Sequence, residues 1–132
     1  MPDYTAIIHS TDEKKFPLVF ITPNTGSRIH SQFGNLKIIR ETSAEQGVKI
    51  SPADARKRNI QTGQKIRIYN QTGELVSRAE ISARVPRGLV VLPNGIWINE
   101  QGGGNKLVAG VETDIGHGAA FHDNRVEIER VE

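Results

Sequence analysis

The segment Lys65–Arg84 restricts the possible folds most, because its pattern is that of a β-hairpin. Its first part, K-I-R-I-Y-N, alternates polar and apolar residues, which is typical of a half-buried strand. Q-T-G at Gln71–Gly73 predicts a tight turn with glycine at the left-handed position. The next strand is expected to run from Glu74 to about Arg84. Its shared face would comprise Leu75, Ser77, Ala79, Ile81, Ala83 and Val85.

Four further apolar segments are predicted to be short strands. They are Phe16–Ile21, Val48–Ile50, Leu89–Pro93 and Arg125–Val131, the last with Val126 and Ile128 facing inward. The segment Leu36–Glu41 fits either a strand or a short helix.

One helix start is clear in S-P-A-D-A-R-K-R-N. Ser51 is a good N-cap, Pro52 suits the first helical position, and Asp54 stands where a capping-box acid belongs. This helix is expected to end near Asn59.

About six short strands with one capped helix predict a mainly β fold, a small closed barrel. Closure would remove exposed strand edges. The chain has 132 residues, which fits one domain, and its 13 glycines and 5% aromatic residues suit tight turns. Residues 1–15 are interpreted as an extended lead-in and residues 16–132 as the barrel.

Composition excludes several kinds of chemistry. The chain has no Cys, which removes disulfides, thiolate metal ligands and a Cys nucleophile, and is compatible with a reducing cytoplasm. No apolar run approaches the ~18–20 residues that span a bilayer, so no membrane insertion by this chain is expected. The first fifteen residues do not resemble a signal peptide. A net charge of +2 is too small to argue for nucleic acid, and no such partner is expected.

Two polar loops, residues 22–35 and 94–124, are the candidate functional segments. The first could be an ordinary solvated turn, since Thr, Asn, Ser and Gly are common turn formers. It could also bind an anion or a heterocycle. The Arg28 guanidinium can donate two hydrogen bonds to a phosphate, and the Thr and Ser hydroxyl groups of the loop can donate further ones. His30 and Gln32 offer both donors and acceptors. Composition alone leaves both interpretations open and favours the turn.

The second loop contains three consecutive glycines within W-I-N-E-Q-G-G-G-N-K-L, which could wrap a phosphate or a polar ring. It lacks the spacing of a P-loop. A metal site formed by His30, His117 and His122 is conceivable, but their spacing favours solvated histidines. No nucleophile motif is present, and no catalytic residue is expected in this chain.

Five motifs in order make the chain similar to a known family. They are R-I-H-S-Q-F-G-N at residues 28–35, V-K-I-S-P-A-D-A-R-K-R-N-I at 48–60, V-P-R-G-L-V-V-L-P-N-G-I-W at 85–97, G-G-G-N-K-L at 102–107 and G-A-A-F-H-D-N-R-V at 118–126. The set resembles the C-terminal molybdopterin-dinucleotide-binding domain of the dimethyl-sulfoxide-reductase family of molybdenum and tungsten oxidoreductases. The resemblance implies a six-stranded double-psi β-barrel with one or two short helices. It also implies binding of bis(molybdopterin guanine dinucleotide), whose dithiolenes hold the Mo or W while another domain supplies the metal's protein ligand.

The same resemblance assigns site residues. Arg28 and Ser31 would contact phosphate, and His30 and Gln32 would make polar contacts to the pterin or a phosphate. The whole implied cofactor-binding set is Thr22, Asn24, Thr25, Arg28, His30, Ser31, Gln32, Asn105 and His122. Gln64 and Val108 depart from the family pattern, and Val108 weakens the expectation of one cofactor contact. For Asp54, a helix cap is favoured over a ligand role.

The implied function is therefore to hold the cofactor without making or breaking bonds. The expected partners are the remaining domains, or the catalytic subunit, of an oxidoreductase. The chain is expected in the cytoplasm, although the full-length enzyme could be exported. A protein-binding adaptor and a stand-alone nucleotide binder remain as alternatives, because the barrel fold does not fix function. An excised domain and a natural small subunit both stay open.

Overall fold

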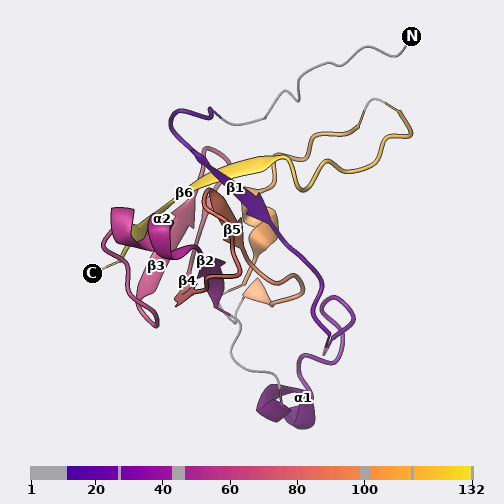
Figure 1. Cartoon of the computed structure of the whole chain (residues 1–132). Coiled ribbons are helices and arrows are strands. Elements are labelled where there is room, and N and C mark those ends of the chain that lie inside the picture. The colour runs from indigo at the N-terminus through magenta and orange to yellow at the C-terminus, as the bar shows by residue number, and fades with distance from the viewer. Residues whose placement is uncertain (1–11, 27, 43–46, 99–101, 114, 132) are drawn as a thin grey trace.

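The structure, a computed structural model, describes residues 12–26, 28–42, 47–98, 102–113 and 115–131 (Figure 1). Six strands form a closed barrel in the order β1-β5-β2-β4-β3-β6. The strands are β1 (Leu18–Ile21), β2 (Val48–Ile50), β3 (Lys65–Tyr69), β4 (Glu74–Ile81), β5 (Leu89–Val91) and β6 (Asn124–Arg130). The predicted mainly β, six-stranded barrel is confirmed. The division into a lead-in and a barrel stays a prediction, and residues 1–11 lie outside the described residues.

Two of the six strand pairings in the barrel are parallel. Strand β1 pairs in parallel with β5, and β2 pairs in parallel with β4. The other four pairings are antiparallel, so β5 lies between β1 and β2. Because parallel partners cannot be joined by a tight turn, longer connections cross the barrel ends. This is the predicted double-psi arrangement, and its crossing connections form the candidate site.

The predicted hairpin is formed by β3 and β4, which pair from Tyr69 with Glu74 to Lys65 with Arg78. The prediction of a left-handed glycine in its turn is wrong: Gly73 has no positive φ, and glycine is needed there because a Cβ would lie 2.6 Å from the Lys106 carbonyl oxygen. Asn70 closes its turn, because its Oδ1 accepts the backbone N–H groups of Thr72 (2.8 Å) and Gly73 (3.2 Å). The prediction that β4 extends to about Arg84 is wrong. Its partner β2 ends opposite the last β4 residue, so the chain loses its ladder there and turns.

Helix α1 (Lys37–Thr42) resolves the ambiguous segment as helical. Helix α2 (Pro52–Lys57) begins as predicted, with the Ser51 Oγ accepting the Asp54 N–H at 3.1 Å. Asp54 does more than cap the helix. Its Oδ2 accepts the Ser51 hydroxyl at 2.6 Å and the Gly88 backbone N–H at 2.8 Å. The buried carboxylate therefore fixes α2 to the turn that leads into β5.

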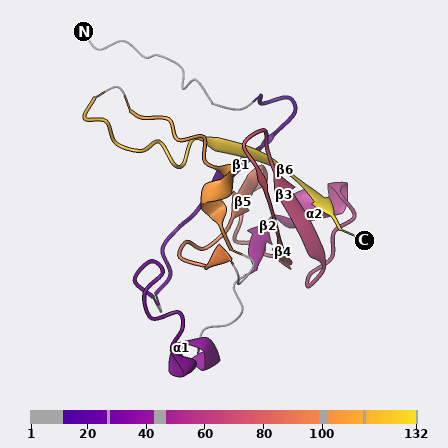
Figure 2. The ribbon, with the colours of Figure 1, turned by 180° about the vertical axis from the view of Figure 1, so that it is seen from behind.

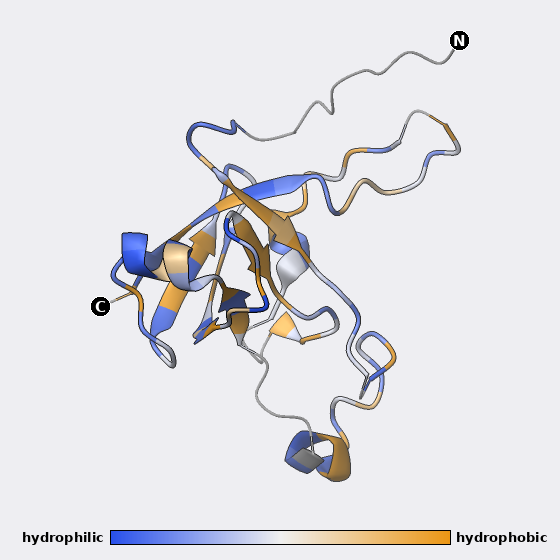
Figure 3. Cartoon of the chain, in the orientation of Figure 1, coloured by the Kyte–Doolittle hydropathy of each residue, from blue (hydrophilic) through white to orange (hydrophobic). Residues whose placement is uncertain are grey.

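Apolar side chains from all six strands fill the barrel, and Figure 3 shows the hydrophobic strand residues gathered there. The inward positions of Val126 and Ile128 are confirmed, as is the buried face of Leu75, Ser77 and Ala79. Ala83 is exposed, since β4 has ended before it. No helix within the described ranges is long and apolar enough to cross a membrane.

Two projections leave the barrel. The α1 arm (residues 29–42) carries α1, and the hairpin arm (residues 109–121) is a long loop closed by a β-bridge between Glu112 and Ala119. Figures 1 and 2, two views from opposite sides, both show the arms extending away from the strands and from each other.

Candidate cofactor cleft

A cleft of ≈ 1120 Å³ opens at one end of the barrel. It is lined by residues 22–24, 30–31, 92–98, 103–106, 108 and 121–122. Small-molecule pockets commonly measure about 300–1,000 Å³, so this cleft suits a large and extended ligand.

The parallel pairing of β1 with β5 creates the first wall. The carboxyl ends of parallel strands meet at the same edge, so the loops after β1 and β5 leave the barrel together. Their backbones continue the ladder: the Leu92 N–H donates to the Ile21 carbonyl (3.1 Å) and the Asn94 N–H to the Pro23 carbonyl (3.0 Å). Residues 21–23 and 92–94, at the bases of the two loops, are thereby held side by side.

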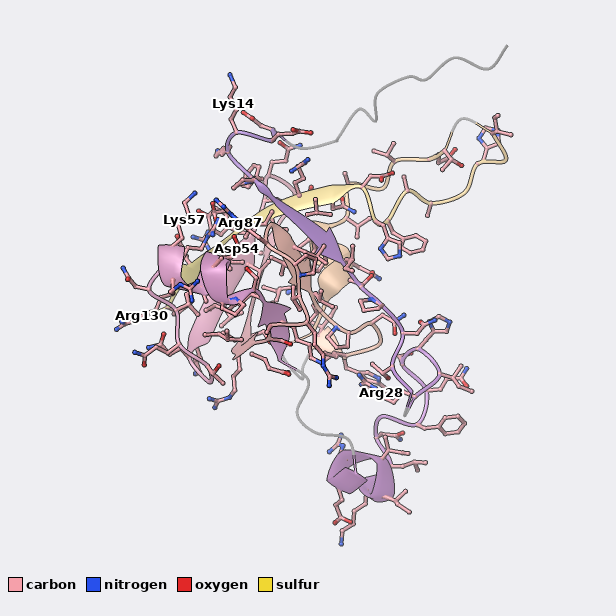
Figure 4. The ribbon with its side chains drawn as sticks, in the orientation of Figure 1. Lys14, Arg28, Asp54, Lys57, Arg87 and Arg130 are labelled. Carbon is pink, nitrogen blue, oxygen red and sulfur yellow. The ribbon has the colours of Figure 1, made fainter. Side chains whose placement is uncertain are left out.

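The two loops touch most closely at Gly95. A Cβ on Gly95 would lie 1.9 Å from the His30 carbonyl oxygen, and the Gly95 φ is 75°. Only glycine fits such an approach at such a φ. Arg28 reinforces the contact, because Nη1 donates to the Gly95 carbonyl and Nη2 to the Asn94 carbonyl, both at 3.4 Å. Figure 4 shows Arg28 beside the α1 arm.

Side chains also link the two loops within the cleft. The Asn94 amide donates to Asn24 Oδ1 at 2.5 Å and lies 3.4 Å from His30 Nδ1. The Trp97 indole N–H donates to the Ser31 carbonyl at 3.1 Å. These contacts fix the polar wall before any ligand arrives.

The second wall is the glycine-rich segment and the 3-10 helix η2 (Gly104–Leu107). A Cβ on Gly102 would lie 2.2 Å from the Ile96 carbonyl oxygen, and one on Gly104 would lie 3.3 Å from Thr22 Cγ2. The glycines therefore let this segment pass close to both other loops. Asn105 and Lys106, which follow them, are exposed in the cleft and can donate hydrogen bonds.

The third wall is the pair Phe121 and His122, whose rings lie 4.4 Å apart between centroids. Buried Asn124 positions them, because its Nδ2 donates to the Phe121 carbonyl (2.9 Å) while its Oδ1 accepts the Ala109 N–H (3.2 Å). Both ends of the hairpin arm are thus tied to the start of β6.

The structure gathers six of the nine predicted site residues around the cleft: Thr22, Asn24, His30, Ser31, Asn105 and His122. Thr25, Arg28 and Gln32 are not among its lining residues. The Thr25 hydroxyl is buried and has no hydrogen-bond partner within the described ranges. Cofactor contact by each of the nine residues stays a prediction.

Sequence reasoning missed three cleft residues that matter to its geometry: Asn94, Gly95 and Trp97. Each makes its contact across more than sixty residues of chain, to Asn24, His30 or Ser31. The only local signal was a polar, glycine-containing segment directly after a buried strand.

No group of three or more His, Cys, Asp or Glu side chains that could hold a metal ion occurs among the residues described. His117 instead lies 3.1 Å from Glu112 on the hairpin arm, while His30 and His122 line the cleft. The conceivable three-histidine site is therefore not assembled.

The cleft residues fit a phosphate-containing heterocycle. Hydroxyl, amide, imidazole and ammonium groups line the cleft together with apolar Leu92, Ile96 and Phe121. Convergent polar donors on apolar walls are the usual composition of a cofactor site. Fold and cleft together define a cofactor-binding barrel domain.

Comparison with known proteins agrees with this class of domain. The family model described as "Molydopterin dinucleotide binding domain" matches residues 18–125, and the chain belongs to this family. It is 34% identical over 118 residues to a putative dimethyl sulfoxide reductase catalytic chain of Halobacterium salinarum, covering 88% of this chain and 14% of that protein. It is 31% identical over 141 residues to dimethyl sulfoxide reductase DmsA of Escherichia coli, covering 99% of this chain and 17% of DmsA.

A solved structure shows the same fold. The acetylene hydratase of Pelobacter acetylenicus superimposes with a TM-score of 0.76 at 17% identity, over 90% of this chain and 19% of the hydratase. The chain thus spans less than a fifth of each of these three proteins. It is a molybdopterin dinucleotide-binding domain, of the kind found in dimethyl-sulfoxide-reductase-type enzymes.

Proposed function

We propose that this chain holds molybdopterin guanine dinucleotide in the cleft as one part of a larger oxidoreductase of the dimethyl-sulfoxide-reductase type. One observation carries the proposal: six predicted site residues that are far apart in sequence line a single cleft, namely Thr22, Asn24, His30, Ser31, Asn105 and His122. When bound, the cofactor supplies a molybdenum or tungsten centre for redox chemistry, and a residue outside this chain ligates the metal.

The chain's own contribution is binding and orientation. Asn24, His30 and Asn94 form a linked polar wall, which presents imidazole and amide groups without further rearrangement. Asn105 and Lys106 provide donors from the opposite wall, and Lys106 adds a positive charge for a phosphate. Arg28, which donates to the Gly95 and Asn94 carbonyls of the cleft wall, adds a second positive charge next to the cleft.

The experiment measures guanine nucleotide in the assembled enzyme. Acid treatment of a bound guanine dinucleotide releases GMP, which is quantified per mole of purified protein. Substituting both His30→Ala and Asn105→Ala should lower the GMP content roughly tenfold or more, since donors are removed from two walls. Lys57→Ala, on exposed α2 outside the cleft, is the matched control and should retain full GMP. Unchanged GMP in the double variant would refute the site.

We also propose that cofactor loading takes place in the cytoplasm, which agrees with the Cys-free sequence. The full-length enzyme could be exported afterwards. Fractionating cells and measuring GMP content in cytoplasmic enzyme tests this point, and cofactor-free cytoplasmic enzyme would contradict it.

A further inference from the structure

Asn94 and Gly95, at the closest contact between the two cleft loops, form the only Asn-Gly pair in the sequence. An asparagine followed by glycine can lose its side-chain amide without the help of an enzyme. The backbone nitrogen of the second residue attacks the asparagine Cγ, and glycine has no Cβ that hinders this approach. The groups around the pair therefore decide whether the folded chain favours the reaction.

The attacking atom, the Gly95 nitrogen, is available in the folded chain. Its N–H has no hydrogen-bond partner among the residues that the structure describes. The Asn94 N–H, by contrast, donates to the Pro23 carbonyl at 3.0 Å and holds the backbone in place. Asn94 and Gly95 are both partly exposed, so water can take up the Gly95 proton. No hydrogen bond to the attacking nitrogen therefore has to break before it reacts.

Arg28 stabilises the charge that develops on this nitrogen. Loss of the Gly95 N–H proton leaves an anion that is delocalised onto the Asn94 carbonyl oxygen. Arg28 Nη2 donates to that oxygen at 3.4 Å, and Nη1 donates to the Gly95 carbonyl at the same distance. A cationic donor aimed at an oxygen on which negative charge develops lowers the barrier to reaction. The guanidinium therefore favours the reactive form of the Gly95 nitrogen.

The nitrogen that leaves, Asn94 Nδ2, also lies among polar groups. It donates to Asn24 Oδ1 at 2.5 Å and lies 3.4 Å from His30 Nδ1. In its imidazolium form, His30 can donate a proton to this nitrogen, which then leaves as ammonia. Because the His30 side chain is exposed, it recovers the proton from water. A stabilising cation and a proton donor thus lie on the two sides of the same Asn-Gly pair.

We infer that Asn94 is a self-modifying site, at which the folded chain promotes the loss of the asparagine amide. A bond forms between the Gly95 nitrogen and Asn94 Cγ while the Cγ–Nδ2 bond breaks, which gives a cyclic succinimide and ammonia. Water then opens the ring. Attack at Cγ gives aspartate, and attack at the Asn94 backbone carbonyl carbon gives isoaspartate. Water is the one co-reactant, and it also takes up the Gly95 proton.

The modification changes the polar wall of the cleft. The new carboxylate has no proton to donate to Asn24 Oδ1, so the side-chain link between the two loops is lost. It also places a negative charge beside His30 in the cleft, where it repels phosphate. The effect on cofactor binding rests on the proposed function, whereas the modification itself does not. A chain that stays empty therefore loses its binding capacity with time.

The test follows the folded chain in neutral buffer by mass spectrometry of its proteolytic peptides. Asn94 should gain the mass of deamidation, whereas Asn105, exposed in the same cleft but followed by Lys106, should stay unmodified. Arg28→Leu should slow the gain at Asn94 roughly tenfold, because it removes the stabilising cation. A loosened loop would speed the reaction instead, so lost structure does not explain a slower rate. Arg87→Leu, on the opposite side of the barrel (Figure 4), is the matched control and should leave the rate unchanged.

Two results would overturn the inference. One is an unmodified Asn94 after a period in which a synthetic peptide of residues 90–98 converts, and the other is an Arg28→Leu rate equal to or above that of the unchanged chain. The GMP content of the assembled enzyme carrying Asn94→Asp tests the consequence for binding and should fall roughly tenfold. Deamidation at Asn94 with full GMP in Asn94→Asp would refute the effect on the cofactor and leave the modification site supported. Low GMP without deamidation would refute the modification site alone.

Discussion

Replacing Gly95 by alanine should open the cleft without unfolding the barrel. The new Cβ would lie 1.9 Å from the His30 carbonyl oxygen, whereas a carbon–oxygen contact needs roughly 3.3 Å. The two loops must therefore separate by about 1.4 Å, the difference between these two distances. Arg28 donates to Asn94 and Gly95 at 3.4 Å, so a shift of that size breaks both bonds.

Gly63→Ala provides the matched control, because Gly63 has a φ of 86° but nothing within 4 Å of the added Cβ. Both variants carry the left-handed backbone cost of about 1–2 kcal/mol in the free energy of unfolding. Denaturant unfolding of the isolated chain should show a loss of that order for each. The loops can separate at this contact to relieve the clash, since His30 and Gly95 lie outside the six strands and the buried core cluster.

Two further readouts distinguish the variants. Trp97 is the only Trp in the chain, and its indole bonds to the Ser31 carbonyl across the affected contact. Its fluorescence should shift to longer wavelength in Gly95→Ala and stay unchanged in Gly63→Ala. In the assembled enzyme, GMP content should fall roughly tenfold in the first variant alone. Equal Trp emission and equal GMP in the two variants would refute the proposed clash.

Two other predictions concern stability. Asp54→Ala leaves the Gly88 N–H and the Ser51 hydroxyl without their buried acceptor, so the free energy of unfolding should fall by about 3 kcal/mol. Exposed Lys57→Ala should change it by less than about 0.5 kcal/mol, and a loss below about 1 kcal/mol for Asp54→Ala would contradict the structure. Burial, followed by nearby Glu129 and Glu127, raises the pKa of the Tyr69 phenol. The unfolded chain therefore releases the Tyr69 proton at a lower pH than the folded chain does, at about pH 10. The free energy of unfolding should fall as the pH rises further. Tyr69→Phe should reduce that fall, and equal slopes in both proteins would disprove it.

Local patterns in the sequence were sufficient for most of the barrel. Alternation across Lys65–Tyr69 and Glu74–Ile81, with a glycine turn between them, encodes the hairpin within a few residues. The N-cap at Ser51 is likewise encoded by the four residues S-P-A-D. Where a long-range contact decided the outcome, prediction was weaker. The end of β4 depends on where β2 ends, and the second role of Asp54 depends on Gly88, thirty-four residues away.

The cleft was harder to predict from the sequence than the barrel, again because long-range contacts form it. Residues 22–32 were identified only through resemblance to a family, because a polar loop and a polar binding wall have the same composition. Their actual environment arises from the parallel pairing of β1 with β5, which aligns this loop with residues 92–97. Neither loop alone encodes that alignment. It follows that the contacts of Asn94, Gly95 and Trp97 with the first loop could be recognised only after the strand order was known.

The same topology explains why one cleft wall can be rigid although its loops are irregular. Two loops that leave adjacent parallel strands are joined at their bases by the ladder, and here by Arg28 and the Asn94–Asn24 pair farther out. Rigidity at that wall reduces the entropy lost when a ligand binds. Among the described residues, the arms beyond it contribute no side chain to the buried barrel core, and they expose apolar side chains instead. The groups that would bind the ligand are therefore held near the strands, where the two loops are joined to each other.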